Sequence, residues 1–214
     1  MTENAAPATT VIPHAGIAMV LPEDWFVVEL TDDEQRVADV TALVGQQLGD
    51  SDELAPLRDH LTRDLLAQTA RAAQAHGLLL AISLMQVDGV PVPASVTVHH
   101  LPGARLDDHG RAVIAEVSRA DAAPGQSVDL GETPHGVVLR RVRATPLAHD
   151  VSDLTEQGTT VETFVVDYWV EPTGTQDLVQ LTFASPLLGA RDALVTLFDS
   201  VARSVHAVPV DAEG

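Results

Sequence analysis

Two long apolar runs near the end of the sequence, joined by a tight turn, constrain the fold more than any other feature. The runs TVETFVVDYWVE (160–171) and DLVQLTFASP (177–186) have the length of strands, and Pro172-Thr173-Gly174 between them is typical of a hairpin turn. Because side chains alternate along a strand, one face of the first run carries an apolar set: Phe164, Val166, Tyr168 and Val170. Strands joined by so short a turn lie antiparallel, which predicts an antiparallel sheet.

Three other parts of the chain predict further strands. A first pair covers Ile17 to Leu21 and Trp25 to Leu30, with Trp25 packed under this hairpin. A second pair, LLLAISLMQV and PASVTVHHL, surrounds Val87-Asp88-Gly89, and Asp-Gly favours a hairpin because the turn needs positive φ. The two prolines in this region, Pro91 and Pro93, either confine the second run to a sheet edge or delay its start. The run VVLRRVRATPL (137–147) adds another strand.

Three segments predict helices. The clearest extends from about Leu54 to His76, with Pro56 in its first turn and Gly77 placed to end it. Its leucines repeat every three or four residues and form one apolar stripe: Leu54, Leu57, Leu61 and Leu65. A shorter helix follows Asp107 or Asp108 with three residues facing inward: Val113, Ile114 and Val117. The last helix buries Leu194, Leu197, Phe198, Val201 and Val205, whereas residues 31–49 fit either a helix or an irregular crossing.

These elements predict an α+β fold, a largely antiparallel sheet with helices packed on it. With 214 residues and no internal repeat or long linker, the chain is expected to form a single domain over residues 11–208. The small polar residues 1–10 and the end at 209–214 are expected to be disordered tails.

The charge balance restricts the partners. The chain has 31 acidic residues against 12 basic ones, which gives a formal net charge of −19. Such a field repels nucleic acid and anionic membrane surfaces, so neither is an expected partner. The acidity either keeps the protein soluble or attracts a basic partner.

Two residue types are missing from the sequence. All 12 basic residues are arginines, and there is no lysine or cysteine, a bias that fits a GC-rich genome. These absences exclude Schiff-base and phosphate-loop lysines, thiol nucleophiles, cysteine zinc sites and iron–sulfur clusters. No GxSxG or GxGxxG motif is present either, so we expect no cofactor. The N-terminus lacks a basic and an apolar segment of a secretory signal, which predicts a cytoplasmic location.

Histidines and carboxylates gather around residues 99–109. His99 and His100 precede Asp107, Asp108 and His109, and imidazole and carboxylate groups are zinc ligands. Adjacent residues on a strand point to opposite faces, so His99 and His100 do not easily share a metal. We therefore predict surface histidines, and keep His99 and His109 only as weak metal candidates.

The candidate binding residues are Trp169, Arg141 and Arg143. Arg141 and Arg143 share one face of a strand, where guanidinium groups bind carboxylate or phosphate. Pairing with carboxylates of neighbouring strands is the favoured interpretation, because four are available: Glu162, Asp167, Glu171 and Asp177. Trp169 and Tyr168 lie on opposite faces of their strand, so Trp169 is either an exposed binding anchor or part of a covered sheet face.

Both ends of the sequence resemble one superfamily. The opening GIAMVLPEDWFVVEL and the ending DLVQLTFASPLLGARDALVTLFDSVARSV are similar to the first strands and to the last strand and helix of Mog1/PsbP-like domains. The resemblance covers roughly a quarter of the chain, with motifs of low specificity. It implies an α/β/α sandwich around an antiparallel sheet. Members of the superfamily are mostly binding proteins: photosystem subunits, a small-GTPase regulator, actinobacterial lipoproteins and secretion-associated chaperones.

The resulting functional hypothesis is a noncatalytic cytoplasmic protein-binding domain, an adaptor or chaperone. This sequence departs from the exported members of the superfamily, since it lacks a signal peptide and a lipid-acceptor cysteine. One alternative is a small enzyme, possibly metal-dependent, in which His99 or His109 meets an acid. Another is a subunit of a larger assembly that uses Trp169 or a sheet edge as its interface.

Overall fold

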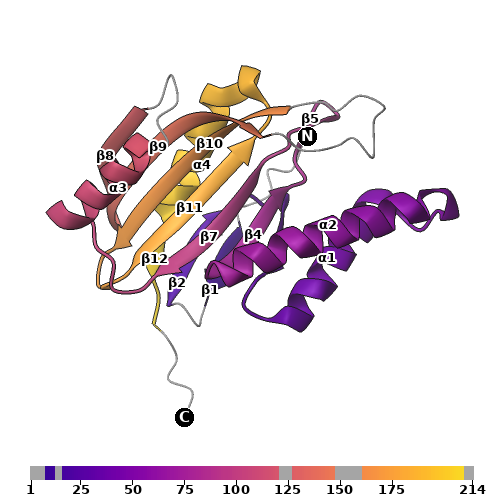
Figure 1. The fold of residues 1–214 in the computed structure, drawn as a ribbon, viewed down its shortest axis with the longest axis horizontal. Helices are drawn as coiled ribbons and strands as arrows, with labels where there is room; N and C mark the ends of the chain where they lie inside the picture. Colours follow the sequence, from indigo (N-terminus) through magenta and orange to yellow (C-terminus); the bar gives the residue numbers. More distant parts are fainter. Residues whose placement is uncertain (1–7, 13–15, 121–126, 148–160, 210–214) are drawn as a thin grey trace, which may run out of the picture.

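A seven-stranded sheet forms the centre of the molecule (Figure 1). The computed structural model describes residues 8–12, 16–120, 127–147 and 161–209. Every neighbouring pair in the sheet is antiparallel, as the sequence predicts. The strand order is β3 (Trp25–Glu29), β4 (Gly77–Ser83), β7 (Ser95–Leu101), β11 (Leu178–Ser185), β10 (Val161–Pro172), β9 (Gly136–Leu147) and β8 (Ser127–Thr133).

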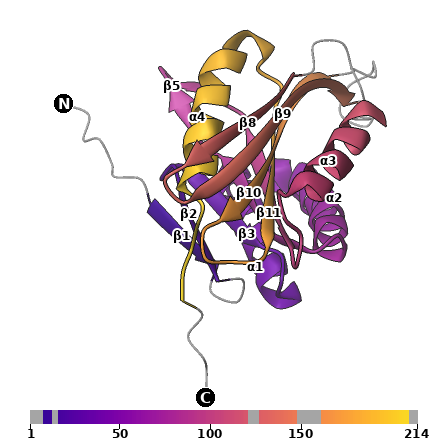
Figure 2. The ribbon, with the colours of Figure 1, turned by 90° about the vertical axis from the view of Figure 1, so that its left-hand side faces the viewer.

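Helices cover both faces of this sheet, which gives the sandwich seen edge-on in Figure 2. One face, which we call the three-helix face, packs against α1 (Asp33–Leu48), α2 (Ala55–Gln74) and α3 (Asp108–Ala120). The opposite face packs against α4 (Arg191–Ser204) and a small second sheet. That sheet has the order β1 (Ala8–Ile12), β2 (Ile17–Leu21) and β12 (His206–Ala207). The predicted α+β architecture is therefore confirmed.

The main core lies between the sheet and α4. The alternating set predicted for β10 is confirmed, because its four members are all buried in this core: Phe164, Val166, Tyr168 and Val170. The apolar stripe of the last helix is confirmed as well, with Leu194, Phe198 and Val201 buried. Phe183 of β11 stacks on Phe198 at a centroid distance of 4.4 Å. The stacked aromatic rings thus join β11 to α4.

The two ends of the described chain meet on one strand. β2 pairs with β1 on one side and with β12 on the other. The backbone N–H of Val20 also donates to the Ser204 hydroxyl at 2.8 Å. Residues 8–12 are therefore a strand, although the sequence assigns residues 1–10 to a tail. The remainder of both predicted tails, 1–7 and 210–214, lies outside the described residues.

Some local predictions are wrong, beginning with the first hairpin. β2 and β3 belong to different sheets, so the turn at Pro22 carries the chain from one sheet to the other. Trp25 consequently packs against Phe183 in the main core, edge-on at 6.3 Å. The ambiguous segment 31–49 is the regular helix α1, which Asp32 caps by accepting from the N–H groups of Glu34 and Gln35.

The central strands follow the sequence closely. Asp88 and Gly89 have positive φ values of 52° and 78° and join β5 (Gln86–Val87) to β6 (Val90–Pro91), as predicted. The prolines delay the following strand, because β7 starts only at Ser95 and occupies the middle of the sheet. Helix α2 begins with Pro56 in its first turn and ends before Gly77, which is already the first residue of β4.

Gly136, at the start of β9, is expected to tolerate no side chain. Its φ is 154°, and a Cβ there would lie 2.0 Å from the Glu171 carbonyl oxygen of β10. Gly136→Ala should therefore lower the free energy of unfolding by about 1–3 kcal/mol, measured by urea denaturation. Gly131→Ala on β8 is the matched control, because its nearest neighbouring atom would be 3.7 Å away. Equal stability of the two variants would contradict the conclusion that a side chain at position 136 collides with the backbone of β10.

Candidate functional site

A cleft of about 490 Å³ lies between α3 and the three-helix face of the sheet. Its lining is mainly apolar and comes from the end of β7, the loop that follows it, α3 and the strands β9, β10 and β11: Leu101, Ala104, Val113, Ile114, Val117, Arg141, Trp169, Leu178 and Gln180 among others. The cleft thus gathers residues from four parts of the chain. Two of the three predicted binding residues, Trp169 and Arg141, line it.

Trp169 forms the floor of the cleft. Its side chain packs with Leu106, Leu139 and Leu178, and the residue is only 7% exposed. Of the two interpretations that the sequence leaves open for Trp169, the structure therefore shows the covered sheet face. The Arg141 guanidinium lies over the indole ring, 5.5 Å from its centroid. The ring and the guanidinium thus form a cation–π contact beneath the cleft, between two almost completely buried side chains.

Asp167 holds the two arginines in place. Arg141 donates through Nε and Nη2 to Asp167 Oδ2, at 3.0 and 2.7 Å, and Arg143 Nε donates to the same oxygen at 3.1 Å. Thr182 Oγ1 donates to the other carboxylate oxygen at 3.0 Å. Asp167 is the cross-strand neighbour of Arg141, so the arginines meet a carboxylate of the adjacent strand. Both are built into the sheet, and Arg141 contacts the cleft from within this network.

Two carboxylates fix the loop that forms one rim of the cleft. Glu171 accepts from the Leu106 N–H at 2.6 Å and from Arg105 Nε at 2.7 Å. Asp177 accepts from the Gly103 N–H at 2.9 Å, and it also contacts His100 at 3.1 Å. The Gly103 hydrogen bond, with help from His100, lowers the pKa of Asp177, so this carboxylate stays ionised. The loop and the start of α3 are therefore attached to the ends of β10 and β11.

The outer rim of the cleft is apolar and open to solvent. The sequence predicts that Val113, Ile114 and Val117 all face inward, yet only Ile114 packs against the Trp169 cluster. Val113 and Val117 are 46% and 52% exposed. The prediction failed because a helix lying on the edge region of a sheet buries a narrower stripe than its apolar pattern suggests. The exposure of Val113 and Val117 beside the cleft is the feature that indicates a binding site, and it can be recognised only in the structure.

The structure separates the predicted histidines. His99 lies opposite Gln180 of β11, whereas the next residue, His100, contacts Asp177 at 3.1 Å. His109 lines the cleft near Asp107. Burial, and then the nearby His76, lower the pKa of His99, whose Nδ1 has no hydrogen-bond partner among the described residues. No group of three or more metal-ligating side chains occurs in the part of the chain that the structure describes.

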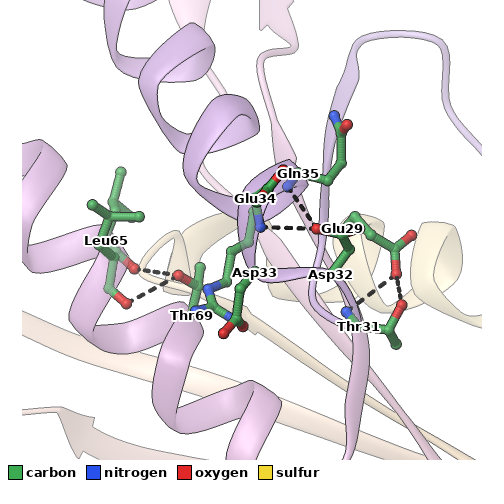
Figure 3. A network of polar contacts seen from close by, with 10 residues as sticks. Glu29, Thr31, Asp32, Asp33, Glu34, Gln35, Leu65 and Thr69 are labelled. Atoms are coloured by element: carbon green, nitrogen blue, oxygen red, sulfur yellow. Dashed lines mark hydrogen bonds and ion pairs between the residues drawn. The ribbon is translucent and has the colours of Figure 1, made fainter.

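A second cavity, of about 610 Å³, lies where α1 begins and α2 ends. Figure 3 shows this region, with Asp32 at the start of α1 and Thr69 of α2 donating to the Leu65 carbonyl. Arg36 lines the cavity with an 11% exposed side chain, yet its ion-pair partner Asp33, at 2.6 Å, is 87% exposed. This cavity contains none of the predicted binding residues.

Comparison with known proteins gives structural similarity only. No family model and no curated protein matches the sequence. The chain is similar to the solution structure of cyanobacterial PsbP from Synechocystis sp. PCC 6803, at 13% identity and a TM-score of 0.46, over 96% of this chain and 95% of that one. It is also similar to the Ran-binding protein Mog1p of Saccharomyces cerevisiae, at 8% identity and a TM-score of 0.43, over 95% and 96% of the two chains.

A third similar structure is LpqN of Mycobacterium tuberculosis, involved in cell envelope biogenesis, at 9% identity and a TM-score of 0.44. The similarity covers 97% of this chain and 88% of LpqN. Within the described ranges, no helix is long and apolar enough to cross a membrane. These similarities concern the overall fold alone.

Proposed function

We propose that this protein is a noncatalytic cytoplasmic domain of the adaptor or chaperone kind, and that a protein partner binds in the cleft under α3. The observation that carries the proposal is the cleft itself, with a tryptophan floor, an immobilised arginine and two exposed valines at its rim. Binding energy in protein interfaces concentrates at such aromatic and arginine groups within well-packed pockets. An apolar side chain of the partner would occupy the cleft against Ile114 and Trp169.

The roles of the three predicted residues differ in this proposal. Trp169 supplies the apolar surface that contacts the partner. Arg141 is held by Asp167 and lies over Trp169, so it gives the cleft a fixed shape without losing side-chain freedom on binding. Arg143 does not line the cleft and supports the site through its bond to Asp167. The net charge of −19 favours a basic partner and a fast, salt-dependent association.

Val113→Asp and Val117→Asp test the proposal, because they place a charge at the exposed rim without opening the core. With the full chain as bait in a lysate of its source organism, the wild type should capture a specific partner. Each variant should lower the affinity for this purified partner by about tenfold or more, measured by calorimetry. Val37→Asp on α1, where the valine is 47% exposed, is the matched control and should bind like the wild type.

The opposite outcomes are equally clear. A partner that binds all three variants with the affinity of the wild type would exclude the cleft as its site. The enzyme hypothesis replaces this one if no partner is captured and the protein instead catalyses a reaction that is lost when His109 is substituted.

A further inference from the structure

The strand β8 forms one edge of the main sheet and is open on its outer side. It pairs with β9 from Ser127 opposite Val142 to Thr133 opposite Gly136, and with no other strand among the described residues. Its first four residues are all exposed. An edge of this kind presents a row of N–H and C=O groups that are free to pair with another strand.

Apolar side chains accompany these backbone groups. Val128 and Leu130 are 46% and 55% exposed, opposite Arg141 and Leu139 of β9. Arg141 lines the cleft and Leu139 belongs to the Trp169 cluster, so the two exposed residues extend the same face of the sheet outward. Of nine large apolar side chains that are exposed in the described part of the chain, four lie on α3 and β8: Val113, Val117, Val128 and Leu130.

Three of the usual devices against unwanted pairing are missing from this edge, although it carries two charged side chains. Natural edge strands are commonly protected by lysine, proline or a bulge, whereas β8, SVDLGET, contains no basic residue and no proline, and its register with β9 is regular. Its charged residues are both acidic, and Asp129 and Glu132 are both exposed. With a net charge of −19, the chain would repel a second copy of itself at this edge and attract a basic segment.

We propose that β8 receives an extended segment of the protein partner as an additional strand of the sheet. The segment alternates apolar residues, which pack on Val128 and Leu130, with arginine or lysine on the other side. This basic side chain faces Asp129, which already accepts from Arg140 Nη2 of β9 at 2.9 Å and can accept a second donor. Main-chain hydrogen bonds would supply affinity and the alternating side chains would supply specificity, as in other cases of strand addition. This inference rests on the proposed function, since it extends the binding surface from the cleft to the neighbouring sheet edge.

The direct probe is a capped seven-residue peptide of alternating arginine and valine. It should bind the full chain and slow hydrogen exchange at those β8 amides that point away from β9. The same peptide methylated at every backbone nitrogen keeps its charge but cannot donate main-chain hydrogen bonds, so its binding should be about tenfold weaker or lost. Equal binding of both peptides would show a purely electrostatic attraction and overturn the proposal.

A double variant, Val128→Lys with Leu130→Lys, tests the strand itself. Val87→Lys with Val90→Lys, at the 58% and 64% exposed valines of the β5–β6 hairpin, is a control of identical charge change. The β8 variant should lose about tenfold in peptide affinity relative to this control. No difference between the two would refute strand addition. Outer β8 amides that are already protected in the free protein and unchanged by the peptide would show that the chain itself covers the edge, which also refutes it.

The captured partner separates this inference from the proposed function. If Val117→Asp abolishes partner binding and the β8 double variant does not, strand addition is wrong and the cleft is still the site. If neither variant affects binding, the proposed site fails as a whole. Loss of binding with both supports one continuous surface.

Discussion

Asp167→Ala is expected to lower the free energy of unfolding by about 3–5 kcal/mol, because it leaves buried arginine charge without its counterion. Asp167 is 1% exposed and Arg141 is 4% exposed, so water cannot replace the lost carboxylate. The lost bonds come from three donors: Arg141, Arg143 and Thr182. Urea denaturation monitored by circular dichroism measures the effect.

A surface pair and a double substitution make this prediction specific. Asp108→Ala removes the ion pair with Arg111, whose members are 102% and 39% exposed, and should cost less than about 1 kcal/mol. Combining Asp167→Leu with Arg141→Met removes the most buried pair and leaves only the partly exposed Arg143 without this carboxylate, so it should recover part of the stability lost in Asp167→Ala. A cost near zero for Asp167→Ala would mean that the arginines find other partners, and that the cleft floor is not fixed by this carboxylate.

Phe183→Ala should be about as damaging, with a loss of about 3–5 kcal/mol. Phe183 is completely buried and contacts three other aromatic rings: Trp25, Tyr168 and Phe198. Its removal opens a cavity between the sheet and α4 that rigid rings cannot refill. Thermal and urea unfolding provide the measurement, together with near-ultraviolet circular dichroism of the remaining aromatic residues.

Phe183→Leu is the matched control, since it keeps most of the apolar volume and should cost less than about 1.5 kcal/mol. Similar losses for the two substitutions would indicate that ring geometry, and not cavity volume, determines stability at this position.

Local signals in the sequence were sufficient for most of the architecture. Alternation along β10, the Asp88-Gly89 turn and the stripe of α4 each follow from interactions within a few residues, and each is confirmed. The pairing partners of the strands do not follow from such signals. The turn at Pro22 looked like a hairpin, yet β2 pairs with β1 and β12 because long-range packing overrides the local turn.

The site was only partly predictable for the same reason. Arg141 and Trp169 stood out because arginine pairs and aromatic residues are scarce in this chain, and the structure brings them together at 5.5 Å. The strand β8 was missed altogether, because its residues SVDLGET carry few of the apolar and β-branched residues that mark a strand. Its backbone pairing with β9 holds these residues in a strand although their own propensity for strands is low.

The pairing of β2 with both β1 and β12 has a consequence for folding during synthesis, because it joins segments from opposite ends of the described chain. The hydrogen bond between Val20 and Ser204 spans 184 residues, and α4, which covers the main core, is synthesised after all seven strands of the main sheet. Until α4 has been synthesised, the apolar sheet face that α4 covers is therefore exposed to solvent. Contacts this distant along the chain slow folding, since a long loop must close before they contribute. A nascent chain with such an open sheet is a natural client for a chaperone until α4 emerges from the ribosome.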